Sequence, residues 1–211
     1  MGYSDHMVIP KYKSYIRQLI ANDIIPNKGI KIAWLGQQDP NENPLGNLSM
    51  YNEIVKFFNE DCSHCFYDIR NKKSWNAHED WGEIKGYDLI LALRLNYLIP
   101  SVKHMLKETR KVIENNNAKY VTDFCSGNVQ ANNTMLSNAI SWKKESKNMI
   151  AYLPEYWAKD IARYGECTPV ASEDNILTRK KVEDAGLVIN RFFSYRCPKN
   201  RFNTVCTLEK L

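Results

Sequence analysis

Hydrophobic and polar residues follow two different spacings along the chain, and the two spacings alternate. In residues 11–22 the apolar positions lie three and four apart, which predicts an amphipathic helix. After the helix-breaking stretch 26–29, residues 30–36 form a short apolar run with β-branched residues that ends in Gly36, which predicts a buried strand. The apolar face of the predicted helix consists of Tyr12, Tyr15, Ile16, Leu19 and Ile20.

The same alternation continues toward the C-terminus. Short apolar runs with aromatic or β-branched residues predict strands at residues 64–69, 87–93 and 119–124. Helices are predicted to follow Asn47 and Ser101, because both residues are of the kind that caps helix N-termini.

Beyond the fourth predicted strand the pattern weakens. Helices are expected around residues 130–147 and 154–163, where the apolar spacing is only partly helical. A clearer helix is predicted over residues 174–185, and Gly186 is well suited to end it.

The last two predicted strands lie close together in sequence. Residues 187–193 and 202–208 are separated by the polar turn 197–200, which predicts an antiparallel hairpin. Strands that alternate with helices predict an α/β fold, namely a doubly wound, mostly parallel sheet with a C-terminal antiparallel hairpin. Ligands bind such sheets at the carboxyl ends of the strands, near the point where the strand order reverses.

The length of 211 residues fits one large domain or two small ones. The alternating pattern favours a single sheet-centred domain over residues 28–211, with an insertion near residues 127–170. Residues 1–27 precede this domain. The first six of them lie before Met7, a plausible natural start, so we expect a remnant of protein expression followed by an N-terminal helix.

Charge and cysteine content narrow the class of protein. A formal net charge of +5 is too small to indicate nucleic-acid binding by itself. No apolar run is long enough to predict a membrane span or a signal peptide. The six cysteines therefore indicate reduced thiols and a cytoplasmic protein. Cys62, His64 and Cys65 are metal-ligand types, but no second pair follows at zinc-site spacing, so we expect no metal.

Three stretches of the sequence have features in a characteristic order. Residues 86–94 form an aromatic–Asp–apolar run before a predicted helix. Residues 183–189 form a helix–Ala–Gly–strand junction, and residues 202–210 form a final strand. In this order the chain resembles the class I, Rossmann-like S-adenosylmethionine (SAM)-dependent methyltransferase family over roughly residues 28–211. The resemblance implies that family's fold, SAM as the cofactor, and methyl transfer as the reaction.

The resemblance implies that the loop after the first strand holds the methionine end of SAM. Family members have several glycines there, because a backbone without Cβ atoms can approach the ligand closely. In this chain the motif is degenerate: it contains Gly36 followed by Gln37, and Trp34 stands where an acidic residue is frequent. A simple strand-to-loop turn is the alternative role for Gly36, and a turn is the favoured role for Asp39.

The resemblance also implies a ribose site after the second strand. Asp68 stands where the family places a carboxylate that accepts both ribose hydroxyls, and Ile69 would then face the adenine. A solvated turn carboxylate is the alternative for Asp68. Asp88, early in its strand, is expected to be structural. The predicted SAM-binding residues are Gly36, Gln37, Asp68, Ile69, Asp80, Trp81, Leu93 and Arg94, with Asn76 as a further candidate at the adenine edge.

Four residues near strand ends or helix starts are candidates for a catalytic group: Asn96, Tyr97, His104 and Asp123. Ribose methyltransferases carry an acidic residue at the end of the family's fourth strand. The strand that resembles it here, within residues 86–94, ends in Ala92–Arg94 instead. The Asn/Asp-Pro-Pro-Tyr/Phe motif of amino-group nucleic-acid methyltransferases is also absent. A small-molecule acceptor is therefore favoured.

Other functions stay open. The degenerate loop is compatible with a catalytically inactive, methyltransferase-like binding or partner subunit, and with an enzyme that holds NAD or another nucleotide. A nucleic-acid methyltransferase is a further alternative, because Arg and aromatic residues are mixed along the hairpin from Arg191 to Arg201, and such residues can stack bases and bind phosphate. No membrane partner is expected, and the oligomeric state cannot be deduced from the pattern.

Overall fold

A computed structural model describes residues 5–46, 48–96, 102–126, 182–197 and 201–211. Within them, side chains are described for residues 9–46, 48–96, 103–123, 182–193 and 205–211. Several expectations lie outside the described residues: the cap at Asn47, the catalytic candidate Tyr97, the insertion with its two helices, and most of the helix predicted for 174–185.

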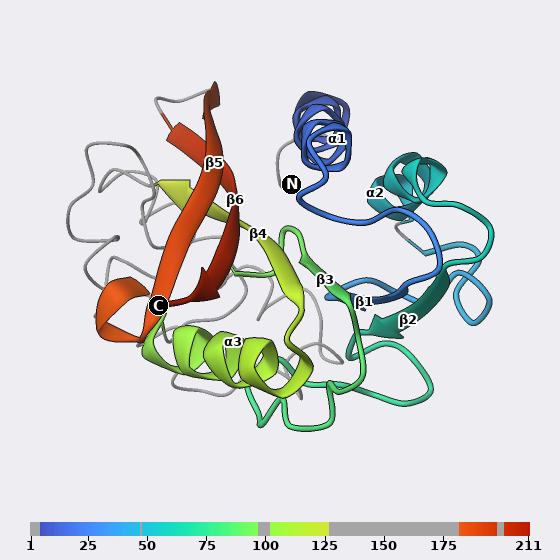
Figure 1. Cartoon of the computed structure of the whole chain (residues 1–211). Coiled ribbons are helices and arrows are strands. Elements are labelled where there is room, and N and C mark those ends of the chain that lie inside the picture. Colours follow the sequence, from blue (N-terminus) through green and yellow to red (C-terminus); the bar gives the residue numbers. More distant parts are fainter. Residues whose placement is uncertain (1–4, 47, 97–101, 127–181, 198–200) are drawn as a thin grey trace, which may run out of the picture.

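Six strands form one sheet with the order β2-β1-β3-β4-β6-β5. The first four pair in parallel, and β6 runs antiparallel to both β4 and β5. The predicted α/β fold with a mostly parallel sheet and a C-terminal antiparallel hairpin is thus confirmed (Figure 1). The strands are β1 Lys31–Leu35, β2 Ser63–Tyr67, β3 Leu89–Ala92, β4 Lys119–Ser126, β5 Leu187–Cys197 and β6 Arg201–Lys210.

Helices cover both faces of this sheet. Helix α1 (Asp5–Ala21) and helix α2 (Ser49–Ile54), which continues as the short 3-10 turn η1 (Val55–Phe57), lie on one face, and α3 (Val102–Asn116) lies on the other (Figure 1). The covering explains the continuous apolar runs of the strands, because successive side chains of a strand point to opposite faces.

Strand β3 shows this division residue by residue. Leu89 and Leu91 belong to the core that contains α1 and α2, whereas Ile90 and Ala92 belong to the core that contains α3. All four side chains are fully or almost fully buried. A strand with polar residues at every second position could not hold this central place.

Several element boundaries differ from the sequence prediction. Helix α1 begins at Asp5, so two of the first six residues, which the sequence places outside the fold, belong to this helix. Helix α2 begins after Leu48, which occupies the N-cap position without a side-chain cap bond. Strand β2 ends at Tyr67, so both Asp68 and Ile69 follow it rather than belong to it.

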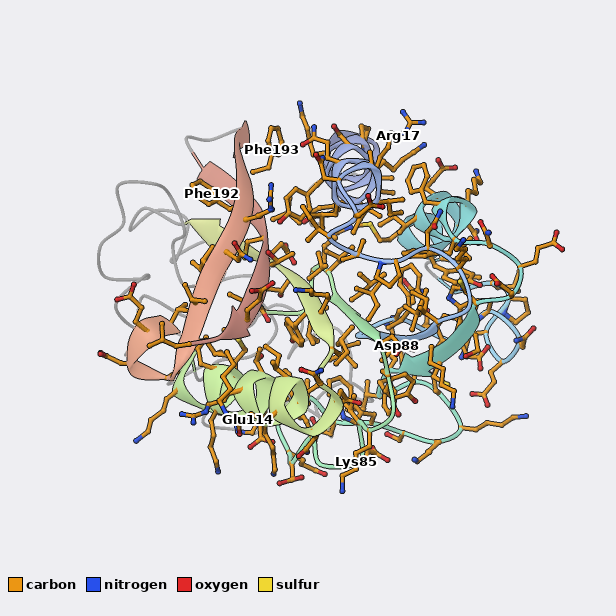
Figure 2. The ribbon with its side chains drawn as sticks, in the orientation of Figure 1. Arg17, Lys85, Asp88, Glu114, Phe192 and Phe193 are labelled. Carbon is orange, nitrogen blue, oxygen red and sulfur yellow. The ribbon has the colours of Figure 1, made fainter. Side chains whose placement is uncertain are left out.

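The strand predicted to start at Tyr87 begins two residues later, at Leu89. Asp88 lies just before it and ties β3 to β1: its Oδ2 accepts a hydrogen bond from the backbone N–H of Lys31 at 2.8 Å. The structural role expected for Asp88 is confirmed, since this contact lies at the amino ends of both strands. Figure 2 labels Asp88 beside the sheet.

Strand β1 lies between β2 and β3, so the strand order reverses beside it. Gly36 follows β1 at this point with a φ of 75°, a left-handed conformation that favours glycine. A Cβ atom on Gly36 would lie 3.0 Å from Cδ1 of Leu95, which follows β3. The chain segments that leave β1 and β3 are therefore packed against each other where such sheets bind ligands.

Candidate functional site

The loop after β1 is held against the end of β2 by backbone and amide groups. The N–H of Gly36 donates to the carbonyl oxygen of Tyr67 at 2.7 Å. Asn71 fixes the rest of the loop: its Oδ1 accepts from the backbone N–H of Asp39 at 2.9 Å, and its Nδ2 donates to the carbonyl oxygen of Phe66 at 3.2 Å. Gln37, the other predicted SAM-binding residue of the loop, is buried.

Asp39 itself forms a turn. Its Oδ1 accepts a hydrogen bond from the backbone N–H of Asn41 at 2.8 Å, the usual arrangement of an Asx turn. The turn role favoured for Asp39 is thus confirmed. The loop of this chain is ordered by hydrogen bonds to Asn71 rather than by a series of glycines.

Asp68 is the first residue after β2, and only 5% of its surface is exposed. Its carboxylate is bound by Arg70. Oδ1 accepts from the backbone N–H at 2.9 Å and from Nε at 2.7 Å, while Oδ2 accepts from Nη2 at 2.7 Å. A carboxylate oxygen has two lone pairs, so these bonds fill Oδ1 and leave one position on Oδ2. The neighbouring Ile69 is half-buried.

The remaining candidates for the adenine edge lie in the loop between β2 and β3. Asp80 is exposed and forms an ion pair with Lys111 of α3, whose ammonium lowers the pKa of the Asp80 carboxyl. Trp81 is completely buried, and its Nε1 donates to the carbonyl oxygen of Ala77 at 3.0 Å. The Oδ1 of Asn76 accepts from the backbone N–H of His78. Asp80 and Trp81 thus both have partners within the chain, Lys111 and the carbonyl oxygen of Ala77.

Trp75, which sequence reasoning missed, is the residue of this loop that lies next to Asp68. Its backbone N–H donates to the carbonyl oxygen of Asp68 at 3.2 Å, and its ring packs edge-on against Tyr67 with 6.0 Å between centroids. The side chain is 3% exposed, and within the described part of the chain its Nε1 has no hydrogen-bond partner. The only sequence signal for Trp75 is a large aromatic residue within a polar loop, and Trp81 shares that signal.

The ends of β3 and β4 are joined by Asp123, which is 5% exposed. Its Oδ1 accepts from the backbone N–H of Arg94 at 2.5 Å, and its Oδ2 accepts from the hydroxyl of Tyr12 in α1 at 2.9 Å. Arg94 has a φ of 60°, which is unusual for a residue other than glycine, and the bond to Asp123 holds it there. Leu93 is half-buried against the core that contains α1.

Asn96 crosses from the end of β3 to the end of β4. Its Nδ2 donates to Oγ1 of Thr122 and to the carbonyl oxygen of Asp123, both at 2.9 Å. Thr122 donates its own hydroxyl hydrogen to the carbonyl oxygen of Ala92, so it accepts from the amide of Asn96, which fixes the orientation of that amide. The Oδ1 of Asn96 is buried and has no hydrogen-bond partner among the residues that the structure describes.

His104 is not brought together with the other catalytic candidates. It lies in α3, and its Nε2 donates to the carbonyl oxygen of Ala77 at 3.2 Å, beside the ring of Trp81. The adjacent His78 is half-buried, and burial together with the charge of His104 lowers the pKa of His78 to about 4. Asn96 and Asp123, by contrast, contact each other directly.

The part of the chain with described side chains contains no group of three or more His, Cys, Asp or Glu residues arranged to hold a metal ion. Cys62 is buried and donates to the carbonyl oxygen of Asn27, Cys65 is exposed, and neither is in a disulfide. No helix in the described ranges has both the length and the apolar character needed to cross a membrane.

Comparison with known proteins identifies the fold. No protein-family model matches the sequence, and no curated protein matches it either. Among solved structures, the trans-methyltransferase CalH in complex with S-adenosylhomocysteine (SAH) is similar, with a TM-score of 0.50 and 13% identity over 94% of this chain and 55% of CalH. PKMT2 from Rickettsia typhi has a TM-score of 0.51 and 11% identity over 96% of this chain and 53% of PKMT2.

The chain thus spans about half the length of each of these two structures. Together with the strand order and the closing hairpin, the similarity shows that the chain has the class I methyltransferase fold. The fold resemblance inferred from the sequence is confirmed.

Proposed function

We propose that this protein binds SAM across the carboxyl ends of β1, β2 and β3 and transfers its methyl group to a small-molecule acceptor. The observation that carries the proposal is the position of Asp68: a buried carboxylate directly after β2, beside the turn at Gly36. Two carboxylate oxygens suit the two hydroxyls of a ribose. The fold shared with CalH, which was solved with SAH, supports the choice of SAM.

The residues at this end of the sheet fit a ribose on one condition. Because Arg70 fills Oδ1 of Asp68, accepting two hydroxyls requires the guanidinium to rotate away. The Arg70 side chain is 53% exposed, so water can solvate the guanidinium once it leaves Asp68, and a bidentate pair with one exposed partner contributes on the order of 1 kcal/mol. Ligand binding can therefore replace Arg70 at low cost, while Gly36 leaves the backbone free of a Cβ atom.

When bound, SAM supplies a methyl group on a sulfonium sulfur, and the reaction then needs mainly the alignment of a nucleophile about 3 Å away. Asn96 is the residue that we assign to this alignment, because its partnerless Oδ1 can accept a hydrogen bond from an N–H or O–H group of the acceptor. Asp123 is assigned a supporting role, since its two oxygens already hold Arg94 and Tyr12.

The test is calorimetric titration of the protein with SAM, SAH and NAD. We expect SAM and SAH to bind in the micromolar range and NAD not to bind. Asp68→Ala is expected to weaken SAH binding by about 10- to 100-fold, because it removes hydrogen bonds to a charged group. Asp80→Ala is the matched control, since this exposed carboxylate pairs with Lys111 and lies outside the proposed site.

A catalytically inactive partner subunit is the second candidate function. The single glycine within residues 34–39 and the engagement of Asp68 by Arg70 favour it. Absence of binding of any of the three nucleotides at millimolar concentration would contradict the SAM proposal and support this alternative.

A nucleic-acid acceptor is the third candidate. In β5, Arg191 is exposed and Phe193 is 36% exposed, whereas Phe192 packs against the core that contains α3 (Figure 2). Most side chains of the remaining hairpin lie outside the described residues. A change in fluorescence anisotropy of a labelled RNA or DNA oligonucleotide, lost in Arg191→Ala, would favour it. A cytoplasmic location stays a proposal that is based on the cysteine content.

A further inference from the structure

Two buried side-chain polar atoms have no hydrogen-bond partner in the part of the chain with described side chains: Asn96 Oδ1 and Trp75 Nε1. Asn96 is accounted for by the acceptor substrate proposed above. Trp75 has no role in that proposal, yet its N–H is a strong donor enclosed by protein. Native structures leave few such groups unpaired, because each one loses its hydrogen bonds to water without replacement.

The neighbouring Trp81 shows that this loop is able to satisfy a buried indole. The two rings lie 5.4 Å apart, and Trp81 donates its N–H to the carbonyl oxygen of Ala77. Trp75 is buried to nearly the same degree without such an acceptor. The difference indicates that the described residues do not supply the acceptor for Trp75, which is the situation expected if a bound ligand supplies it.

The place of Trp75 defines which part of a ligand could supply that acceptor. Its backbone N–H is bonded to the carbonyl oxygen of Asp68, so the two residues are direct neighbours although seven positions apart in sequence. In a nucleoside the base is joined to the ribose by a single bond. A ribose at Asp68 therefore carries its base into the surroundings of Trp75, and the ring nitrogens of adenine are hydrogen-bond acceptors.

We infer that the Trp75 indole N–H donates a hydrogen bond to a ring nitrogen of the adenine and so helps to select the base. The inference rests on the proposed SAM site and adds to it a specificity-determining residue. It also explains why Trp81 and Asp80 need not contact the adenine, since one is satisfied within the loop and the other is paired with Lys111.

The experiment combines a change in the protein with a change in the ligand. SAH and three analogues, each with adenine N1, N3 or N7 replaced by C–H, are titrated into wild type, Trp75→Phe and Trp81→Phe. We expect one analogue to bind wild type about 3- to 10-fold more weakly than SAH, the effect of one lost neutral hydrogen bond. Trp75→Phe should lose a similar factor for SAH and no longer distinguish that analogue.

Trp81→Phe is the matched control, because it removes an indole N–H that is already bonded within the loop. It should distinguish the analogue as wild type does. If Trp75→Phe does not fold, Trp75 is replaced by 3-benzothienylalanine, which keeps the ring shape and has sulfur in place of the N–H. The same titrations are then made with that variant.

The outcomes separate the two proposals. If wild type binds SAH but Trp75→Phe binds it equally well, or if all three analogues bind wild type like SAH, the inference about Trp75 is overturned and the SAM site stands. If wild type does not bind SAH, the proposed function is overturned, and the inference with it.

Discussion

The carboxyl edge of the sheet has two halves, and each contains one buried carboxylate and one buried polar atom without a partner. At the end of β2 the carboxylate is Asp68 and the unpaired atom is a donor, Nε1 of Trp75. At the ends of β3 and β4 the carboxylate is Asp123 and the unpaired atom is an acceptor, Oδ1 of Asn96.

The difference lies in what binds the two carboxylates. Asp68 is held by the half-exposed side chain of Arg70, which can exchange with solvent or ligand. Asp123 is held by a backbone N–H and by the hydroxyl of Tyr12, a side chain with no exposed surface. A carboxylate with a replaceable partner is suited to bind a ligand, whereas one with fixed partners is suited to stabilise the fold.

The largest expected effect tests this difference through stability. Asp123→Ala removes the buried carboxylate that accepts from the Tyr12 hydroxyl and the Arg94 N–H, and should lower the free energy of unfolding by about 2–4 kcal/mol. Asp68→Ala should lower it by about 1 kcal/mol or less, because its main partner is exposed. Urea unfolding measures both losses, and equal values would show that Asp68 is held as firmly as Asp123.

Acid should destabilise the β2 side of the sheet through His78, which lies in the loop between β2 and β3. The pKa of His78 is about 4 in the folded protein and about 6.5 when unfolded, so the unfolded state binds more protons between these values. Stability is therefore lost as pH falls below about 6.5, by on the order of 1–2 kcal/mol between pH 7 and 5. Burial also lowers the pKa of His64, which adds a loss of the same sign.

Denaturant unfolding at several pH values checks this expectation. In His78→Gln the loss between pH 7 and 5 should shrink markedly. An unchanged pH dependence in that variant would show that His78 does not remain neutral in the folded protein.

The smallest effect tests whether the two halves are packed together at Gly36. Gly36→Ala imposes a Cβ atom on a residue with positive φ and pushes it against Leu95. Gly86→Ala is the matched control, since Gly86 has a φ of 79° but nothing within 4 Å of its added Cβ atom. Both substitutions cost about 1–2 kcal/mol in backbone strain. Gly36→Ala should cost about 1 kcal/mol more, because of the contact with Leu95.

Thermal or urea unfolding of the two alanine variants gives this difference directly. If both variants lose the same free energy of unfolding, the segments after β1 and β3 can move apart without an energetic penalty. The two halves of the edge would then not be coupled through Gly36.

The fold could be predicted from the sequence because it depends on patterns that burial imposes. Continuous apolar runs mark strands covered on both faces, and alternation with helices marks a parallel sheet. Asp68 could be singled out for a related reason, since it stands directly after such a run. The hairpin also followed from pattern alone, because only a short polar turn separates its strands.

The partners of the site residues could not be predicted, because they depend on side-chain rotamers and on how loops return to the sheet. Nothing in the sequence indicates that Arg70 binds Asp68 or that Asn71 fixes the loop after β1. The sequence also offers two tryptophans in one loop, and only the hydrogen bond from Trp81 to Ala77 shows which indole is satisfied.

Recognition of the SAM ribose by Asp68 can be measured by titrating SAH, and an SAH analogue that lacks the ribose 2′-hydroxyl, into wild type and Asp68→Asn. We predict that wild type binds SAH at least about 10-fold more tightly than the analogue, and that Asp68→Asn reduces this preference to about 3-fold or less. An equal preference in both proteins, or no binding of SAH to wild type, would contradict the account.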